Sequence, residues 1–162
     1  VVQERGFRLP ERYLEFEPQV RALEAAMRVR REPTVPCNND LLAENFIDVG
    51  GTMRLIDYEY SGNNEPSFEL GNVWSESNLS LAQLQQLVAE YYGRQLANKV
   101  ARCRVWGLMS KYGWTLWGSI QDGISDIDFD FWGWAMEKYE RAVAEFDGPE
   151  FEQLLADVQR ED

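Results

Sequence analysis

The chain of 162 residues contains no histidine, and this absence removes several kinds of chemistry at once. Serine–histidine and cysteine–histidine catalysis need an imidazole base, and many transition-metal sites need an imidazole ligand. Neither can be built from this chain alone. A carboxylate is then the natural general base, and phosphoryl transfer works with one because positioning and charge neutralisation dominate that reaction.

Cysteines and long apolar runs are also scarce. The only cysteines, Cys37 and Cys103, lie far apart in the sequence, and we expect two buried thiols rather than a disulfide. No apolar run approaches the length of a membrane span, and no basic segment leads into an apolar stretch as in a signal peptide. We therefore expect a soluble, cytoplasmic protein with no membrane partner.

Basic residues are outnumbered, with 16 lysines and arginines against 28 acidic residues and a net charge of −12. This balance argues against a nucleic-acid partner, whose phosphates need basic patches. It suits a cationic substrate, although excess acid often only confers solubility. A hydrophobic content of 44% excludes a disordered acidic polymer, and the length predicts a single domain over residues 1–162.

Asp40 and Asn45 lie five positions apart, and a second aspartate, Asp57, follows a segment that has the pattern of a β-hairpin with a Gly50-Gly51 turn. In phosphoryl-transfer sites one aspartate accepts the proton of the substrate hydroxyl, while an asparagine and a second aspartate bind magnesium. The hairpin would fold Asp57 back beside Asn45, so that two oxygen ligands meet one hard cation. Spacing alone is ordinary turn chemistry, and only the combination favours a kinase site.

Residues 37–76 resemble the choline/ethanolamine kinase branch of the aminoglycoside-phosphotransferase-like kinases. That family carries Cys-His-Asn-Asp-Leu, a five-residue step to Asn, Ile-Asp-aromatic-Glu-Tyr and Phe-Asp-Ile-Gly-Asn-His-Phe-Cys-Glu. The matching runs here are Cys37–Leu41, Ile56–Tyr60 and Phe68–Glu76. A second block from Trp114 through Gln121 to Phe129 also resembles the family, and the similarity extends from about residue 36 to residue 146.

Three positions depart from the family pattern. Asn38 replaces the usual histidine, which raises the question of how rigid the catalytic loop is. Glu69 replaces an aspartate and could shift the backbone amides that the shorter acid would hold. Trp134 stands where another aromatic residue, usually tyrosine, is expected.

The resemblance implies a catalytic base, a magnesium site and an aromatic box for the substrate cation, with ATP and Mg²⁺ as cofactors. The residues implied are Asp40 as base, Asn45 and Asp57 as metal ligands, and Glu76, Trp114, Trp117 and Trp134 as the substrate-binding box. Tryptophans three apart on a helix are more often core than cage, and the resemblance favours the cage. Such a cage is expected to prefer a methylated ammonium over a primary amine. Trp74, Trp106 and Trp132 are assigned to packing.

The fold expected is α+β and predominantly α: the C-terminal helical lobe of a protein-kinase-like fold, with one β-hairpin that carries the metal ligands. Helices are predicted over about 14–31, from Pro66, from a capping box at Ser80 and Gln83, and over about 95–121, 130–146 and 149–159. The hairpin at about 45–57 is predicted to be the only β element. The glycine-rich loop, the Val-Ala-x-Lys strand and the five-stranded sheet of an N-terminal nucleotide-binding lobe are absent. We expect residues 1–162 to be an isolated C-terminal lobe that needs the missing N-terminal lobe as a partner and is inactive without it.

The sequence therefore predicts an ATP-dependent small-molecule kinase lobe that acts on the hydroxyl of choline or a related amino alcohol. Two alternatives stay open. An aminoglycoside or other polar-amine O-phosphotransferase would use the same base but need an acidic, open pocket. A catalytically silent choline-binding fragment would keep the box without turnover.

Overall fold

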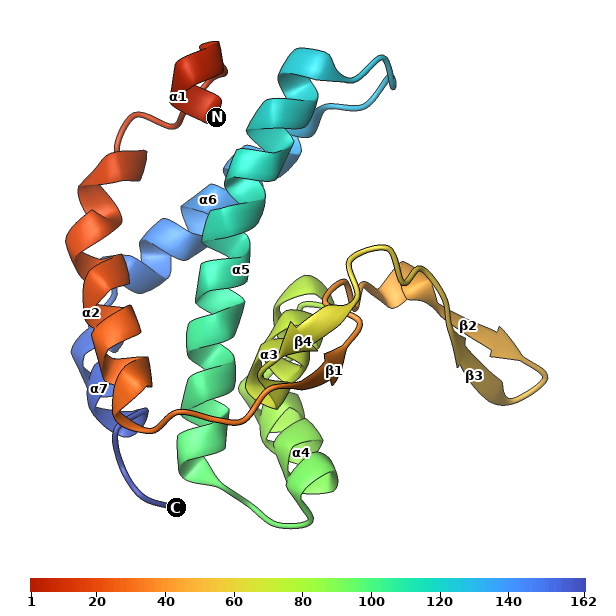
Figure 1. Ribbon diagram of the computed structural model, residues 1–162, viewed down its shortest axis with the longest axis vertical. Coiled ribbons are helices and arrows are strands. Elements are labelled where there is room, and N and C mark those ends of the chain that lie inside the picture. Colours follow the sequence, from red (N-terminus) through yellow and green to blue (C-terminus); the bar gives the residue numbers. More distant parts are fainter.

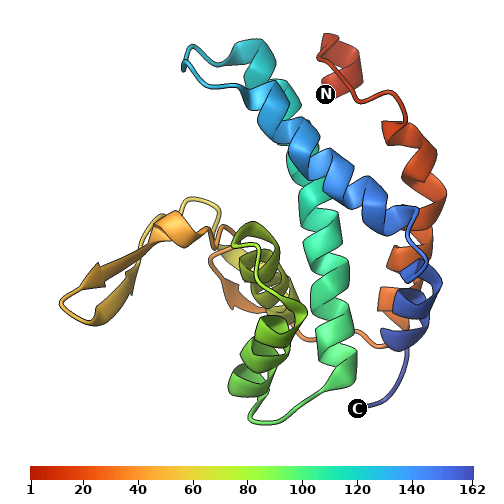
Figure 2. The ribbon, with the colours of Figure 1, turned by 180° about the vertical axis from the view of Figure 1, so that it is seen from behind.

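The computed structural model describes residues 1–162 and is organised around one long helix, α5 (Ala97–Ile124), of 28 residues. Helices α2 and α7 lie on one side of α5 and α6 crosses it, while α3 and α4 lie on the other side (Figure 1). The view from behind shows the same two groups with α5 between them (Figure 2). The remaining helices are α1 (Val2–Arg5), α2 (Glu17–Val29), α3 (Pro66–Glu76), α4 (Leu81–Tyr92), α6 (Phe131–Phe146) and α7 (Phe151–Asp157), with 3₁₀ turns at Tyr13–Phe16 and Ala43–Asn45.

Two apolar clusters hold these helices together, one on each side of α5. The larger contains 15 buried residues, among them Phe16, Leu23, Leu108 and Phe146. The smaller, on the α3 and α4 side, includes the buried Cys103. Each large apolar side chain that is fully buried contributes roughly 1.5–3 kcal/mol. Both cysteines are buried and free, which confirms the prediction of buried thiols.

The helix starts follow the signals in the sequence. Pro66 occupies the first turn of α3, where its missing N–H is not needed. At the start of α4, the Ser80 hydroxyl accepts a hydrogen bond from the Gln83 amide (3.3 Å) and the Gln83 side chain accepts one from the Ser80 amide (2.8 Å). The helix predicted from residue 14 begins as a 3₁₀ turn and becomes α-helical only at Glu17, with Pro18 in its first turn.

The hairpin was predicted correctly: β2 (Phe46–Val49) pairs antiparallel with β3 (Thr52–Leu55). Gly50 and Gly51 form its two-residue turn with φ values of 61° and 83°, and hairpin turns with two positive φ values favour glycine at both positions. The hairpin projects away from the helices (Figures 1 and 2).

The prediction that this hairpin is the only β element was wrong. A second antiparallel pair joins β1 (Val35–Cys37) to β4 (Gly62–Asn64). Each strand has only three residues, and Pro36, Gly62 and Asn64 belong to types that are depleted in strands, so no local pattern announced them. The β1–β4 pair brings together the two ends of the segment between residues 37 and 62, from which the hairpin projects.

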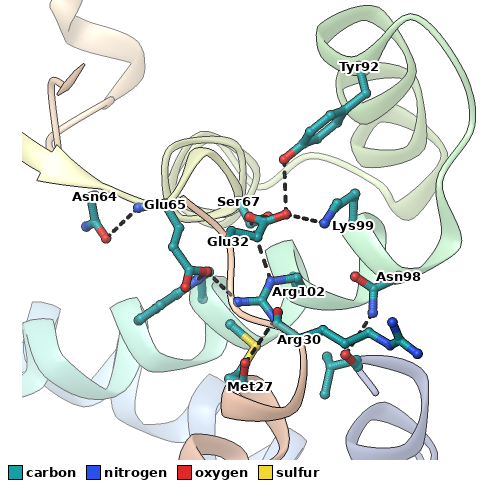
Figure 3. A network of polar contacts seen from close by, with 12 residues as sticks. Met27, Arg30, Glu32, Asn64, Glu65, Ser67, Tyr92, Asn98, Lys99 and Arg102 are labelled. Atoms are coloured by element: carbon teal, nitrogen blue, oxygen red, sulfur yellow. Dashed lines mark hydrogen bonds and ion pairs between the residues drawn. The ribbon is translucent and has the colours of Figure 1, made fainter. Parts of the chain in front are cut away.

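Buried Arg102 of α5 connects the end of α2 with the start of α3 (Figure 3). Its guanidinium donates hydrogen bonds to the backbone carbonyls of Met27 (3.2 Å) and Arg30 (2.7 Å) and to the Glu65 carboxylate (2.6 Å). The Arg102 guanidinium therefore holds both ends of the segment from residue 31 to residue 65. This segment contains Asp40, Asn45 and Asp57.

Glu32 is the second anchor of that segment (Figure 3). Its carboxylate accepts a hydrogen bond from the Ser67 hydroxyl (2.6 Å) and pairs with the Lys99 ammonium at 2.5 Å. Burial alone would raise the pKa of Glu32, but the hydrogen bonds from Lys99 and Ser67 lower it below its ordinary value. Glu32 is therefore held as a charged, paired carboxylate against α5.

Candidate active site

The loop that carries Asp40 is braced by the side chain of Asn38. The Asn38 carboxamide donates to the Asp57 carbonyl (2.7 Å) and accepts from the Asp40 amide (2.9 Å). The Glu69 carboxylate accepts hydrogen bonds from the backbone amides of Asn38 and Asn39. Asn38 thus ties the loop to the segment of Asp57, and the longer acid at Glu69 still reaches both amides.

Asn45 and Ile56, the residue before Asp57, are hydrogen-bonded at the base of the hairpin. The buried Asn45 side chain donates from Nδ2 to the Asp40 carbonyl (2.8 Å), which leaves its carboxamide oxygen as an acceptor. Its backbone carbonyl accepts from the Ile56 amide (3.0 Å), so the next residue, Asp57, follows directly after this contact. Asp57 has a φ of 60°, in a left-handed region that non-glycine residues seldom adopt, and such backbone is frequent at functional sites.

A cavity of about 190 Å³ brings Asp40 together with every residue predicted for the substrate box. Asn45 and Asp57 are not among its walls. The lining residues are Asp40, Leu42, Glu59, Tyr60, Glu76, Trp114, Trp117 and Trp134. Three of them, Leu42, Glu59 and Tyr60, had not been assigned to the site, although two belong to the Ile56–Tyr60 run that carries the resemblance.

Trp117 is the centre of the aromatic wall. Its ring centroid lies 5.8 Å from that of Trp114 and 5.5 Å from that of Trp134, both with edge-to-face geometry. Tyr60 extends the wall, with its ring 6.2 Å from that of Trp114. The close approach of α5 and α6 depends on Gly118, where a Cβ atom would stand 2.7 Å from the Cβ of Ala135.

Glu76 lies on the wall of the cavity with a partner that had not been anticipated, Lys138 of α6. The Lys138 ammonium lies 2.5 Å from Glu76 Oε2, and these side chains are only 9% and 4% exposed. The same ammonium sits 4.5 Å from the centroid of the Trp134 ring. Lys138 follows Trp134 by four residues on a helix, and that spacing was the available sequence signal.

The Asp40 side chain is buried and lies near other acidic side chains. Burial, and then the negative charges of Asp57, Glu76 and Glu59, raise the pKa of the Asp40 carboxyl above its ordinary value. A general base is most effective when its pKa lies near the working pH, so the shift moves Asp40 in the direction that such a role requires.

The chain has clear relatives among small-molecule kinases. The Choline/ethanolamine kinase family profile matches residues 11–86. "Ethanolamine kinase 2" of Homo sapiens is 32% identical over an alignment of 152 residues that covers 75% of this chain and 39% of that protein. A choline/ethanolamine kinase family protein from Mesorhizobium loti superposes with a TM-score of 0.85 at 31% identity, covering 94% of this chain and 52% of that structure. The chain belongs to the choline/ethanolamine kinase family.

Other relatives of the chain differ in the substrate that their names give. "Thiamine kinase" of Escherichia coli O1:K1 / APEC is 36% identical over 98 residues, covering 54% of this chain and 35% of that protein. Choline kinase LicA from Streptococcus pneumoniae shares the fold, with a TM-score of 0.69 at 24% identity over 91% of this chain and 48% of that structure. The chain spans about two fifths of the length of the ethanolamine kinases it matches and about half of the Mesorhizobium loti structure.

A larger cavity of this family member, about 370 Å³, lies elsewhere, between α2 and α5. Its walls are mainly apolar, and its acids, Glu24, Glu32 and Glu65, are already engaged by Arg28, Lys99 and Arg102. It therefore offers no free base, and the smaller cavity at Asp40 is the candidate active site. None of the helices combines the length and apolar character that crossing a bilayer requires.

Proposed function

We propose that residues 1–162 are the C-terminal, substrate-binding lobe of an ATP-dependent kinase that phosphorylates the hydroxyl of a small amino alcohol of the choline and ethanolamine type. The observation that carries this proposal is the composition of one cavity: Asp40 shares it with three indoles and Glu76. A base for a hydroxyl and a wall for a cation are the two elements that an amino alcohol needs. The named activities of the ethanolamine and choline kinases among its relatives support the same class of acceptor.

In the proposed reaction the indole faces and Glu76 bind the cationic end of the acceptor, which directs its hydroxyl toward Asp40. The hydroxyl oxygen attacks the γ-phosphorus of ATP, and the bond from that phosphorus to the bridging oxygen of ADP breaks. Asp40 accepts the hydroxyl proton as the new P–O bond forms. Positioning supplies most of the catalysis in such transfers, which is why the bracing of the loop by Asn38 matters.

Asn45 and Asp57 are the residues that would hold magnesium. A carboxylate and a carboxamide oxygen are ligands that a hard cation accepts, and the amide group of Asn45 is already used in the bond to Asp40. No group of three or more histidine, cysteine, aspartate or glutamate side chains is arranged to hold a metal in this chain. Two protein ligands suit Mg²⁺, which usually keeps waters and phosphate oxygens in its shell. When bound, the ion would neutralise charge on the phosphates of ATP.

The size of the cavity supports a small acceptor over an aminoglycoside. Pockets for drug-sized ligands usually measure about 300–1,000 Å³, whereas this cavity measures about 190 Å³. The aromatic wall likewise differs from the open acidic pocket expected for a polyamine sugar. We propose that a nucleotide-binding lobe is the partner of this lobe.

Phosphoryl transfer by the full-length protein to a panel of amino alcohols and aminoglycosides tests this proposal. Asp40→Asn should lower kcat by about 10²–10⁴-fold, the usual contribution of a general base. Asp48→Asn, at an exposed aspartate on the hairpin outside the cavity, is the matched control and should keep normal turnover. Near-normal turnover by Asp40→Asn, or a preference for aminoglycosides, would contradict the proposal.

A further inference from the structure

A separate cavity of about 320 Å³ lies where the end of α3 meets α5 and α6. Its walls include Ser75 and Asn78 at the end of α3, Lys111 of α5, and Arg141 and Glu145 of α6. None of its lining residues belongs to the candidate active site. Ligand pockets usually measure about 300–1,000 Å³. The cavity is therefore a second space of ligand size.

Arg141 faces this cavity without an acidic partner. Glu137 precedes it by four residues on α6 and Glu145 follows it by four, and side chains at that spacing on a helix can pair. The arginines of α2 that have a glutamate four positions earlier do form such pairs. The Arg141 guanidinium instead donates to the Ser75 carbonyl at 3.3 Å. It is therefore turned away from its own helix and toward the end of α3.

The charges around Arg141 leave it uncompensated. Glu145 is paired with the Lys111 ammonium, so these two charges largely cancel. Burial lowers the pKa of Lys111 and the positive charge of Arg141 lowers it further, which places the two cations close together. Arg141 is partly buried, whereas every other arginine without an acidic partner is exposed. In a chain with 28 acidic residues, this cavity thus keeps one free positive charge.

Hydrogen-bond donors remain free at the same place. A guanidinium has five N–H donors, and only one bond of Arg141 is made within the protein. Asn78, which also lines the cavity, is exposed and its carboxamide makes no hydrogen bond. The planar fork of a guanidinium matches the oxygens of phosphate in two-point contacts. A phosphate monoester adds three strong acceptor oxygens and a charge of about −1.5 to −2 at pH 7.

We propose that this cavity binds a small phosphate monoester, held by the Arg141 guanidinium and the Asn78 carboxamide. The Lys111 side chain is only 3% exposed and paired with Glu145, so it contributes positive charge and not a direct contact. The alternative is that Arg141 only caps α3, because a cation is favourable at a helix C-terminus. That role explains the Ser75 contact but leaves the cavity and the free donors without a purpose.

Calorimetric titration of the full-length protein with ethyl phosphate tests the proposal. Ethyl phosphate has no ammonium group for the aromatic box, and EDTA removes the magnesium that the proposed active site would use to hold phosphate. Saturable binding with a Kd at or below about 1 mM is expected. Acetate, with one charge and two oxygens, should bind at least about tenfold more weakly. No saturable binding, or acetate bound equally well, would overturn the proposal.

Inorganic phosphate is the second probe, because it has the same oxygens without an organic group. The cavity has room for that group, so ethyl phosphate should bind at least as tightly as inorganic phosphate. Tighter binding of inorganic phosphate would rule out a monoester as the ligand. Because the two cavities share no residue, a negative result here leaves the proposed function intact.

Variants assign the binding to this cavity. Arg141→Gln removes charge-assisted hydrogen bonds and should weaken ethyl phosphate by about 10- to 150-fold, while Arg141→Lys keeps the charge without the fork and should lose less. Arg94→Gln is the matched control, because Arg94 also lacks an acidic partner but is exposed and outside the cavity. It should leave the Kd unchanged. An equal loss in both variants would show a general charge effect and contradict the assigned site.

The capping role makes a different prediction for the same variant. If Arg141 only caps α3, Arg141→Gln lowers the melting temperature and leaves the Kd as it was. Should Arg141→Gln fail to fold, Asn78→Gly still decides, since glycine suits the left-handed backbone at Asn78, where φ is 51°. Loss of the carboxamide should weaken ethyl phosphate by about 2- to 12-fold. Unchanged affinity in Asn78→Gly and Arg141→Lys would overturn the assignment.

Discussion

Replacing Arg102 by methionine should destabilise the protein strongly, although Arg102 contacts none of the residues proposed for catalysis. Its side chain is fully buried. Removing the guanidinium leaves the Glu65 carboxylate without its charged partner and two carbonyls at the end of α2 without a donor. Breaking a buried ion pair costs about 3–5 kcal/mol. For a domain of this size each kcal/mol lowers the melting temperature by about 2–4 °C, so the expected loss is roughly 6–20 °C.

Thermal unfolding followed by circular dichroism at several pH values measures this loss. The folded-state pKa of Glu32 is lowered, so the stability from its pairing is fully present above the ordinary value of 4.5 and is lost as pH falls through the folded value. Lys99 and Ser67 cause most of the lowering of the Glu32 pKa and Arg102 causes the least, so wild type and Arg102→Met should both lose this stability below about pH 4.5. Arg21→Met removes an exposed pair, 71% and 61% exposed, and should cost about 0–1 kcal/mol. A shift of under 2 °C for Arg102→Met at pH 7 would refute the reasoning.

Four further outcomes are expected. Asp40→Asn should raise the melting temperature at neutral pH. The pKa of Asp40 is raised in the folded state, so the stability that this carboxyl contributes is present below about pH 3.8 and is lost as pH rises through the folded-state pKa. Equal melting temperatures of the variant and wild type at neutral pH would contradict this. Gly118→Ala should cost about 1–3 kcal/mol by overpacking and raise the KM of the acceptor, which melting and kinetics measure together. Asn38→Ala should lower kcat more than it changes KM, with Asn38→His recovering part of the loss, whereas an unaltered kcat would show that the brace is dispensable. Trp117→Ala should raise the KM of the acceptor by about 2- to 30-fold and that of ATP far less; equal changes would assign Trp117 to packing alone.

Local signals explain what the sequence predicted correctly. The hairpin was predictable because two glycines in its turn and alternating apolar residues act over neighbouring positions. The capping box at Ser80 and the proline at the start of α3 are local in the same sense. The family motifs name the residues of the candidate site, and one cavity is lined by Asp40 together with the predicted box, whose roles stay predictions.

The missing parts of the prediction depend on contacts between distant residues. Glu76 and Lys138 are separated by 62 positions, and Arg102 and Glu65 by 37. Charged residues are usually solvated, so no local pattern predicts which distant partner each of these four meets. The pairing of β1 with β4 was also missed, because its register depends on the loop closing and not on strand propensity.

The projecting hairpin implies an uneven distribution of local stability. Its two strands pair only with each other, and Ile47, Val49 and Met53 on it are 41%, 58% and 58% exposed. An isolated two-stranded hairpin is marginally stable in water, so amides near its tip should exchange with solvent hydrogen much faster than those of α5. Its base is different, because the side chains of Asn38 and Asn45 hydrogen-bond it to the loop that carries Asp40. The boundary between fast and slow exchange should therefore fall between the tip and Asp57, which leaves the proposed metal ligands on the slowly exchanging side.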